Sequence, residues 1–322
     1  MTVKERLLPL LSESEFISGE QAAKELNVSR AAVWKAVELL RREGCIIEAV
    51  TNKGYRLSGN TDILQADKIN GLLGPLSESL YINVEQSVTS TNVLLKEKAA
   101  SGAPEGTVLI ASSQTSGRGR FARKFYSPKN SGIYMSILLR PDMPAENAVL
   151  ITTAAAAAVA VAAENLSGKK TEIKWVNDVL ISGKKICGIL TEAALNVESG
   201  SLDYAVLGIG INAYVPSGGF PDEIKNIAGA VFDERAANLR NRLAAEVLKS
   251  FYGFYSSLRS RGFLYEYRRR SAVIGKRIAV ISQDGSVPAT ALGIDDNCRL
   301  HVKYADGRTE FLSSGEISTK IV

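Results

Sequence analysis

The residues best suited to chemistry lie in one short basic stretch, Gln114 to Tyr126, which reads Gln-Thr-Ser-Gly-Arg-Gly-Arg-Phe-Ala-Arg-Lys-Phe-Tyr. Glycines alternate with arginines here, and the small side-chain bulk lets backbone N–H groups approach an anion closely. Arg118 and Arg120 supply forked, permanently charged donors for phosphate or carboxylate. The stretch predicts a loop that holds a nucleotide or an acid. A flexible basic surface turn is the alternative, which a short motif alone does not exclude.

A second group of polar residues interrupts an apolar stretch further along the chain. Residues 172–181 are typical of a strand, residues 182–183 of a tight turn and residues 184–192 of a return strand. Asn177 and Asp178 fall inside the first strand, and polar groups that enter a core need partners or a purpose. We expect them to form the other half of the site.

A third candidate is the start of a predicted helix. The polar segment 87–92 leads into the apolar residues 93–96, which places hydroxyl groups and free backbone N–H groups at a helix N-terminus. Such an end can bind a polar ligand. The alternative is that Ser90 or Thr91 simply caps the helix.

Composition narrows the class of chemistry. The chain has 322 residues, 45% of them apolar, a net charge of +5 and a pI near 9.0, which predicts two or three globular domains and permits binding to nucleic acid or acidic substrates. His301 is the only histidine, so a Ser-His-Asp triad is excluded and a histidine-ligated metal centre is disfavoured. The chemistry must therefore use Arg, Lys, Asp and a bound cofactor.

Cysteine usage and apolar runs indicate a cytoplasmic protein without membrane contact. Cys45, Cys187 and Cys298 are far apart and form neither a metal-binding nor a disulfide pattern, which fits a reducing compartment. The N-terminus lacks the features of a signal peptide. The longest mild-apolar run, residues 148–163, is shorter than the roughly 20 residues that span a bilayer, so we expect a buried helix.

The first sixty residues predict a winged helix-turn-helix. We expect a first helix over residues 3–11, a second helix that begins at Ser18 and a third that begins at Ser29. Ser18 and Gln21 have the spacing of a capping box. A wing of two strands follows the third helix. The strands are expected at residues 45–50 and 55–57. The residues expected to contact DNA are Ser29, Arg30, Ala31, Trp34, Lys35, Lys53 and Arg56. A small helical protein-interaction domain is the alternative.

The remaining elements predict a central α/β domain and a small β domain. A polar linker is expected at residues 58–62. Strands are expected at 81–84, 107–112, 133–139 and 204–212, with helices at 146–166 and 235–258. Short strands at 277–281, 288–294, 300–304 and 309–312 predict an SH3-like β-barrel. The expected domains are residues 1–60, 64–270 and 271–322, a multidomain α+β chain.

Three motifs follow one another along the chain: Gly117-Arg118-Gly119-Arg120, then Lys174-Trp175-x-Asn177-Asp178, then Lys185-x-x-Gly188-Ile189-Leu190. Over essentially its whole length the chain resembles the biotin–protein ligases. The winged domain makes it similar to the bifunctional kind, which is both ligase and biotin operon repressor. The resemblance implies that the central domain has the mixed α/β fold of class II synthetases and biotin ligases.

This resemblance implies a two-step reaction. Biotin and Mg-ATP give biotinyl-5′-adenylate and pyrophosphate, and biotin then passes to a lysine of a biotin carboxyl-carrier domain of a carboxylase. It implies biotin-binding positions at Ser90, Thr91, Asn92, Gln114, Gly117, Arg118, Lys185 and Gly188. It implies nucleotide-binding positions at Arg118, Arg120, Arg123, Phe125, Asn177, Asp178 and Asn212, with Lys185 and Arg120 as catalytic residues. Magnesium is implied through ATP, with help from Asp178 and no protein-only metal site.

The chain departs from the family pattern in three places. Relatives often carry Arg-Gly where this chain has Phe121-Ala122, tryptophan where it has Phe125 and proline where it has Val176. Two of these departures lie in the basic loop, and they affect the expected dynamics of that loop, while catalysis is still expected.

Regulation is implied as well. In bifunctional relatives the adenylate favours a homodimer that binds a two-fold operator. The competing hypotheses are a ligase without a DNA-binding role, a regulator that senses biotin without catalysis, and a lipoate–protein ligase, whose family lacks both the Gly-Arg-Gly-Arg loop and the winged domain.

Overall fold

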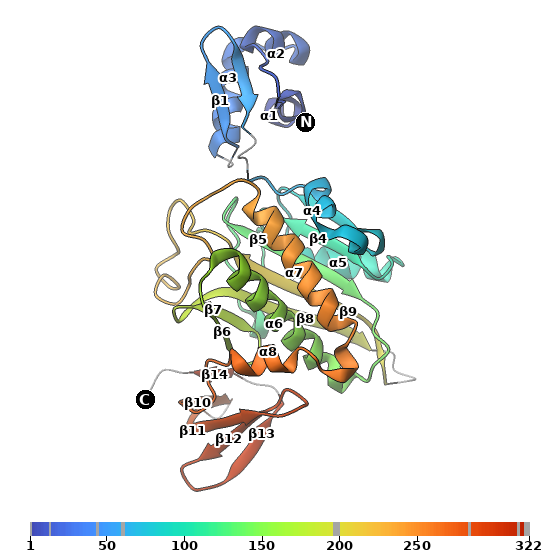
Figure 1. Ribbon diagram of the computed structural model, residues 1–322, viewed down its shortest axis with the longest axis vertical. Helices are drawn as coiled ribbons and strands as arrows, with labels where there is room; N and C mark the ends of the chain where they lie inside the picture. Colours follow the sequence, from blue (N-terminus) through green and yellow to red (C-terminus); the bar gives the residue numbers. More distant parts are fainter. Residues whose placement is uncertain are drawn as a thin grey trace. The chain divides into compact units, whose positions relative to one another are not determined.

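The structure is a computed structural model of the chain (Figure 1). The structure describes residues 2–12, 14–42, 45–58, 62–195, 200–282, 285–313 and 316–318. The chain divides into two compact units, residues 1–65 with 234–242 and residues 66–233 with 243–322. The expected division into three domains at residues 60 and 270 stays a prediction.

The first unit begins with the three expected helices. They are α1 (Val3–Leu7), α2 (Gly19–Leu26) and α3 (Arg30–Arg42). The expectation of one continuous helix over residues 3–11 is wrong, because the chain tightens into the 3₁₀ turn η1 (Leu8–Leu10). Pro9 accounts for this, since proline has no N–H for an α-helical bond and its ring clashes with the preceding turn.

Helix caps and burial in this unit follow the local sequence. The Ser29 hydroxyl accepts a hydrogen bond from the Ala32 N–H, and Ser18 accepts one from the Gln21 N–H. The Gln21 side chain bonds Glu25 instead of closing a capping box. The expected inner faces are buried: Ala22, Ala23 and Leu26 on α2, and Val33, Ala36, Val37 and Leu40 on α3.

A two-stranded wing completes the unit. Strands β1 (Ile47–Val50) and β2 (Gly54–Leu57) pair antiparallel. Gly54 adopts φ +103°, and a Cβ there would lie 2.1 Å from the Ile17 carbonyl oxygen, so only glycine fits the turn into the wing. The wing therefore packs directly against the segment before α2.

The linker after the wing ends in a buried ion pair. Residues 59–61 of the expected linker lie outside the described part of the chain, but Asp62 is buried and its carboxylate accepts hydrogen bonds from the backbone N–H and the Nε of Arg240. Asn241 bonds the Ile63 carbonyl and the Gln65 N–H. The last residue of the expected linker is thus buried, because Asp62 pairs with a residue 178 positions away in sequence.

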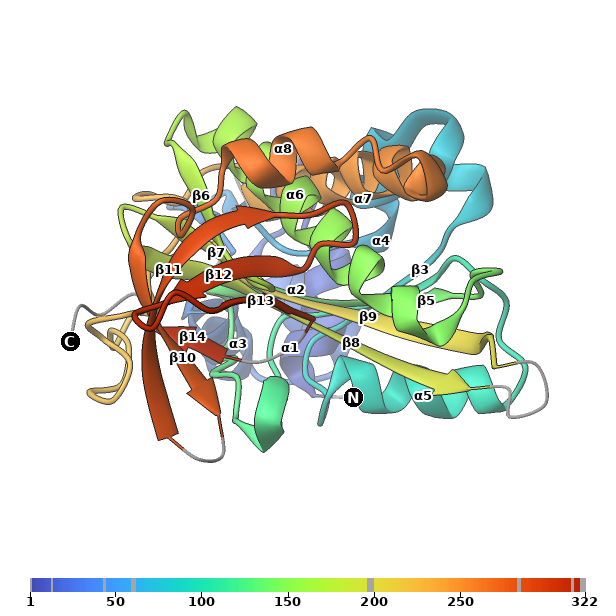
Figure 2. The same ribbon diagram turned by 90° about the horizontal axis from the view of Figure 1, so that it is seen from below.

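The second unit is built on a seven-stranded sheet with the order β3-β4-β5-β9-β8-β7-β6. The strands are β3 (Tyr81–Glu85), β4 (Thr107–Ala111), β5 (Gly132–Leu139), β6 (Thr171–Lys174), β7 (Asp178–Ile181), β8 (Lys184–Leu195) and β9 (Leu202–Asn212). Only β3 and β4 pair in parallel. Figure 2 shows α5 (Thr91–Ala100) and α6 (Ala148–Ser167) on opposite faces of this sheet.

Helix α6 is the expected alanine-rich core helix. Every residue from Ala154 to Ala160 is fully buried, because alanine lets the helix backbone approach the sheet closely. In the described part of the chain one helix, Ala145–Ser167, is long and apolar enough to cross a membrane, and 67% of its apolar window is buried. That burial is the behaviour of a core helix.

The stretch 172–181 is not the single strand expected. It folds as a hairpin in which β6 and β7 pair antiparallel around residues 175–177. Trp175 turns inward, where its indole N–H donates to the Cys298 carbonyl oxygen at 2.9 Å, and the Tyr267 hydroxyl donates to the Val176 carbonyl oxygen at 3.0 Å. These long-range hydrogen bonds hold the bend and place Asn177 and Asp178 at its exit.

The remaining α-helices are α4 (Ala66–Leu73), α7 (Leu239–Tyr255) and α8 (Leu264–Arg269). Short 3₁₀ turns lie at Gly74–Ser79, Arg120–Ala122, Ala145–Asn147 and Leu258–Ser260. Helix α7 is shorter than the expected residues 235–258 and begins only after Asn238, which has φ +55°. Left-handed backbone does not continue a right-handed helix. The helix therefore starts beyond this residue.

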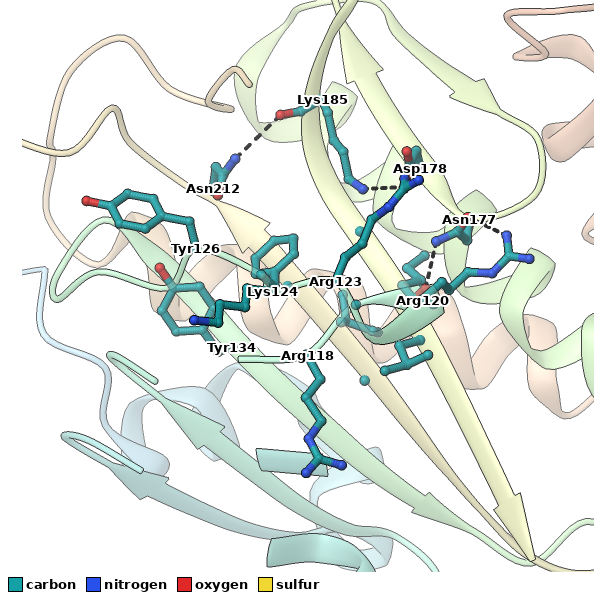
Figure 3. A pocket seen from close by; sticks show the side chains of 18 of the residues that line it. Arg118, Arg120, Arg123, Lys124, Tyr126, Tyr134, Asn177, Asp178, Lys185 and Asn212 are labelled. Carbon is teal, nitrogen blue, oxygen red and sulfur yellow. Dashed lines mark hydrogen bonds and ion pairs between the residues drawn. The ribbon is translucent and has the colours of Figure 1, made fainter. Parts of the chain in front are cut away.

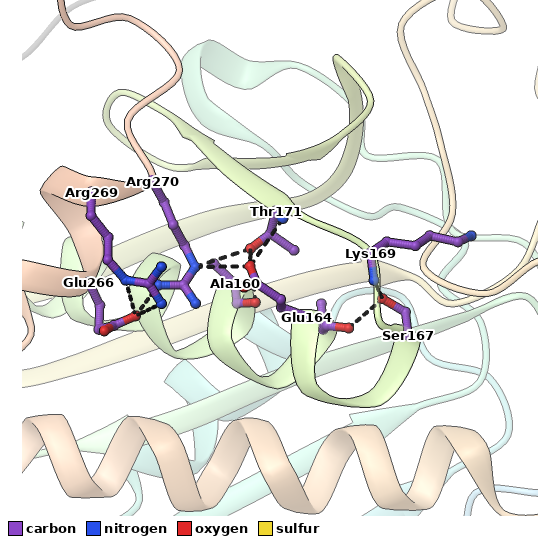
Figure 4. A network of polar contacts seen from close by, with 9 residues as sticks. Ala160, Glu164, Ser167, Lys169, Thr171, Glu266, Arg269 and Arg270 are labelled. Atoms are coloured by element: carbon purple, nitrogen blue, oxygen red, sulfur yellow. Dashed lines mark hydrogen bonds and ion pairs between the residues drawn. The ribbon is translucent and has the colours of Figure 1, made fainter.

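A buried arginine joins α6, β6 and α8 (Figure 4). The Arg270 guanidinium donates to the Thr171 hydroxyl at 3.2 Å, lies 3.4 Å from a Glu164 carboxylate oxygen and pairs with Glu266. Burial alone would raise the pKa of Glu164, but hydrogen bonds from Thr171 and the charge of Arg270 hold that pKa below its ordinary value of 4.5. Both carboxylates therefore depend on Arg270.

We expect Arg270→Leu to lower the free energy of unfolding by about 2 kcal/mol, because the partly buried carboxylates of Glu164 and Glu266 lose the cation that they share. Arg269→Leu removes an exposed partner of the same Glu266 and should cost less than about 1 kcal/mol. Urea denaturation followed by circular dichroism measures both. Equal destabilisation by the two variants would contradict this assignment.

The stabilisation by Glu164 depends on pH. Since the pKa of Glu164 is lowered on folding, the contribution of Glu164 to the free energy of unfolding is present above pH 4.5 and is lost as the pH falls through the lowered pKa.

The C-terminal part of the second unit is a small β domain. Strands β10 (Arg277–Ser282), β11 (Gly285–Ile294), β12 (Leu300–Tyr304), β13 (Thr309–Leu312) and β14 (Glu316–Ser318) form an antiparallel sheet in the order β13-β12-β11-β10-β14. No ladder joins β13 to β14 within the described residues. The expected strands are confirmed, while closure into an SH3-like barrel is not.

Candidate active site

One cavity of about 350 Å³ brings the separate motifs together. Its lining comes from the start of α5, the basic loop, the β6–β7 bend and strands β5, β8 and β9, and from a loop at residues 220–228. Of the expected ligand-binding residues it includes Ser90, Thr91, Asn92, Gln114, Arg118, Arg120, Arg123, Phe125, Asn177, Asp178, Lys185, Gly188 and Asn212. The basic loop is therefore part of a cavity and not an isolated surface turn.

The α5 N-terminus is capped from outside the helix. Ser90 occupies the cap position, yet its side chain makes no capping hydrogen bond. The Gln114 side-chain carbonyl oxygen accepts from the Thr91 N–H at 2.9 Å instead and lies 3.2 Å from the Thr91 hydroxyl. The alternative in which Ser90 or Thr91 simply caps the helix is therefore wrong, and the Ser90 hydroxyl can face the cavity.

The cavity floor is made flat by glycines on β9. A Cβ at Gly208 would lie 2.2 Å from the Asn92 Oδ1, and a Cβ at Gly210 would lie 2.6 Å from the Phe125 ring. Contacts that short do not occur between real side chains. Both positions therefore need glycine so that Asn92 and Phe125 can lie on the sheet.

The charged groups gather at the other end of the cavity (Figure 3). Arg120 Nη1 donates to Asn177 Oδ1 at 3.1 Å, and Lys185 Nζ lies 2.6 Å from Asp178 Oδ1. Figure 3 shows Arg123 directed toward Asp178, whereas Arg118 points away from this group. The positive charge is thus distributed over two sides of the cavity, which suits an anion larger than a single phosphate.

Asn212 holds the backbone of the site. Its Nδ2 donates to the Gly229 carbonyl oxygen at 3.0 Å and lies 3.4 Å from the Lys185 carbonyl oxygen. The neighbouring thiol of Cys187 is fully buried, and this burial raises its pKa far above the usual range, so it stays protonated and unreactive. Lysine, arginine and carboxamide groups are left to do the chemistry.

Among the expected residues Gly117 alone lies outside the cavity lining. A Cβ there would lie 2.6 Å from the Phe125 carbonyl oxygen and 2.6 Å from the Ser127 Oγ, so this glycine permits close packing of the loop. Sequence reasoning missed the lining residues Tyr134, Met135, Phe220, Ile224 and Ile227. Most are apolar or lie on loops without a motif, so no local pattern marks them.

Phe121 and Ala122, which together form the first departure from the family pattern, both adopt left-handed backbone, with φ +55° and +56°. For residues with a Cβ this conformation costs roughly 1–2 kcal/mol each. We expect Ala122→Gly to relieve the strain at that position and to slow dissociation of a ligand held by this loop about two- to fivefold, as measured by release of labelled ligand. Ala122→Val, which adds strain, should act in the opposite direction, and equal rates in the two variants would contradict the argument.

The residues expected to contact DNA lie on α3 and the wing. Exposed are Ser29, Arg30, Ala31, Trp34, Lys35 and Lys53, with Trp34 55% exposed. Arg56 is instead paired with Glu48 at 2.6 Å and lies over the Phe16 ring. Its charge is thus partly neutralised within the wing.

Family models match the chain in three places. Residues 84–212 match the biotin/lipoate A/B protein ligase family, residues 4–56 match an HTH domain, and residues 273–320 match the biotin protein ligase C-terminal domain. The matched ligase segment contains the α5 start, the basic loop and the Lys185 strand. The class of the protein is therefore that of the biotin and lipoate ligases.

Relatives of the same length narrow the class. The chain is 36% identical to the bifunctional ligase/repressor BirA of Bacillus spizizenii over 97% of this chain and 98% of the relative, and 29% identical to that of Escherichia coli over 99% and 98%. A biotin protein ligase from Aquifex aeolicus, solved with biotin and ATP, aligns at TM-score 0.60 and 26% identity over 74% of this chain and 97% of its own. The chain belongs to the family of bifunctional biotin ligase/repressors. It is an ATP-dependent biotin–protein ligase with an N-terminal helix-turn-helix domain.

Proposed function

We propose that both steps of biotin transfer take place in the cavity described above. A biotin carboxylate oxygen attacks the α-phosphorus of ATP and displaces pyrophosphate, which gives biotinyl-5′-adenylate. The amine of a carrier-domain lysine then attacks the biotinyl carbonyl carbon, and AMP leaves. No covalent bond to the protein is needed.

The arrangement of charge carries this proposal. In the first step two anions must meet in line, and fixed positive groups reduce their repulsion. We assign Lys185, which lies 2.6 Å from Asp178, to the biotin carboxylate and the α-phosphate. We assign Arg120, which donates to Asn177, to closure of the loop over the adenylate. Positioning and charge are the whole of the protein's contribution.

The two ends of the cavity divide the substrate between them. We assign the biotin head to the α5 end, with Ser90, Thr91, Asn92, Gln114, Arg118 and Gly188, and the nucleotide to Arg120, Arg123, Phe125, Asn177, Asp178 and Asn212. Magnesium prefers oxygen ligands, and the Asp178 carboxylate is the oxygen donor at that end suited to it. Bound mostly by phosphates, the ion would neutralise charge on ATP.

The test is biotin-dependent exchange of labelled pyrophosphate into ATP by the purified protein, with lipoate in place of biotin as the comparison. We expect exchange with biotin and none with lipoate. Absence of exchange with biotin would discard the cavity as an adenylation site and leave a regulator that senses its ligand without catalysis.

Regulation by DNA binding is the second part of the proposal. The exposed basic and aromatic face of α3 suits the major groove, and Lys53 suits a phosphate. We propose that the adenylate orders the basic loop and thereby favours a homodimer that represses biotin genes at a two-fold operator. All three cysteines are buried and free, in keeping with a cytoplasmic location.

Charge reversal separates the two activities. We expect Arg30→Glu with Lys35→Glu to weaken operator binding by at least about a hundredfold at 0.1 M salt, because phosphate contacts supply most of the affinity. Pyrophosphate exchange should stay unchanged. Binding curves from fluorescence anisotropy measure the first quantity. Operator affinity like that of the unmodified protein would support a ligase without a DNA-binding role.

A further inference from the structure

Glu192 lies just beyond the cavity lining and makes a contact that the reaction does not explain. It occupies β8 two residues after Leu190 and four after Gly188, so all three side-chain positions share one face of the strand. One carboxylate oxygen accepts from Asn92 Nδ2 at 2.9 Å, and the other lies 2.6 Å from Lys96 Nζ. Glu192 therefore touches a residue of the biotin end without touching the cavity itself.

The neighbours of Asn92 fix the orientation of its side-chain amide. An asparagine amide offers two N–H donors and one acceptor oxygen with two lone pairs. Both donors are used, by the Glu192 carboxylate and by the Leu190 carbonyl oxygen at 3.3 Å. The oxygen lies 2.6 Å from the Ser136 hydroxyl and sits directly over Gly208, on the cavity floor. Toward a ligand, Asn92 can therefore act only as an acceptor.

Gln114, in contrast to Asn92, is left with a hydrogen-bond donor for a ligand. Its oxygen faces the backbone N–H and the hydroxyl of Thr91, while Nε2 donates one hydrogen to Ser127 Oγ at 3.0 Å. Its second N–H is the group left for a ligand. A fixed acceptor and a fixed donor at one end of the cavity match a group that carries an N–H beside a carbonyl oxygen, as a cyclic urea does.

Of the two acceptors that hold the Asn92 N–H groups, the Glu192 carboxylate is the stronger. A hydrogen bond to a charged acceptor is roughly twice as strong as one between neutral groups, and the Leu190 contact is also longer. Burial alone would raise the pKa of Glu192, but Lys96, Asn92 and the charge of Arg118 hold it below its ordinary value. The carboxylate is therefore ionised and accepts hydrogen bonds at neutral pH.

We infer that Glu192 is a positioning residue that holds Asn92 as a fixed acceptor for a ureido N–H of the substrate, and thereby selects acids that carry this N–H. The inference rests on the proposed function and adds a specificity determinant to it. Without Glu192 the amide can rotate and present its N–H group to the cavity. The site then loses its preference for a donor on the ligand.

The experiment compares biotin with its two cyclic carbamate analogues, in each of which an oxygen replaces one ureido N–H. Pyrophosphate exchange gives the ratio of kcat/KM for biotin and analogue. In the unmodified protein one of the two analogues should be disfavoured at least about tenfold beyond the other, because a buried acceptor then faces an oxygen. Glu192→Gln should bring that ratio to within about threefold and raise KM for biotin about tenfold, with KM for ATP changed less than about twofold.

Lys96→Met is the matched control, since it removes the other partner of Glu192 but keeps the Asn92 contact. It should retain the preference between analogues. If Glu192→Gln folds poorly by thermal unfolding, Glu192→Asp, which keeps the charge on a shorter side chain, should show a smaller loss of the same preference. An unchanged preference in a folded Glu192 variant, or an equal loss in Lys96→Met, would overturn the inference. Absence of exchange with biotin in the unmodified protein would instead overturn the proposed function, and this inference with it.

Discussion

Replacing Lys185 with alanine is expected to lower biotin-dependent pyrophosphate exchange about 10²- to 10³-fold, the usual cost of losing one group that stabilises transition-state charge. The ammonium group is the cation that Asp178 holds at the cavity, 2.6 Å from its carboxylate. In its absence the biotin carboxylate and the α-phosphate meet with less compensation, and Asp178 adds a third negative charge. The effect should therefore appear in kcat as well as in KM.

Lys184→Ala is the control for this experiment. Lys184 precedes Lys185 on the same strand but is exposed and does not line the cavity. Exchange by this variant should stay within about twofold of the unmodified protein, as expected for a surface change. Thermal unfolding of both variants separates loss of fold from loss of chemistry. Near-normal exchange by a folded Lys185→Ala would remove Lys185 from the mechanism.

Replacing Arg120 with glycine is expected to speed release of the adenylate by about tenfold or more, since a charged hydrogen-bonded contact closing a site mainly sets the off-rate. The guanidinium joins the basic loop to Asn177 at 3.1 Å and lies 4.9 Å over the Phe121 ring. The variant loses both contacts, and glycine adds backbone freedom. The released mixed anhydride should then acylate lysines of unrelated proteins.

Two measurements check the Arg120 prediction. Release of labelled adenylate from the purified variant gives the rate, and biotin incorporated into an added bystander protein gives the leak. Lys129→Gly is the control, because Lys129 is exposed and lies outside the cavity lining. Adenylate release at the unmodified rate would refute the role of Arg120 in retention.

Much of the architecture follows from local sequence. Two helices begin at the capping residues Ser18 and Ser29, the wing strands follow from alternation, and helix α6 follows from its apolar periodicity. All three kinds of pattern depend on neighbours in the chain. The three linked motifs also contain charged or polar groups that line the cavity, among them Arg118, Arg120, Asn177, Asp178 and Lys185. Patterns of this kind are readable because their physical cause lies within a few residues.

Other features were decided only by tertiary structure. Asp62 is buried because Arg240 folds against it, and residues 172–181 bend into a hairpin because Trp175 and Val176 bond to residues more than 90 positions away. No local pattern records such a partner.

In the active site, too, some features follow from local sequence and others from tertiary structure. The amino-acid sequence alone shows which charged and polar groups are available, since their types and motif spacing are local. Only the folded chain decided that Gln114 caps α5, that Glu192 holds the Asn92 amide and that glycines of β9 give that amide room. Hydrogen-bond direction and steric clearance depend on strands and helices that meet in space, and for this protein they set what the cavity can recognise.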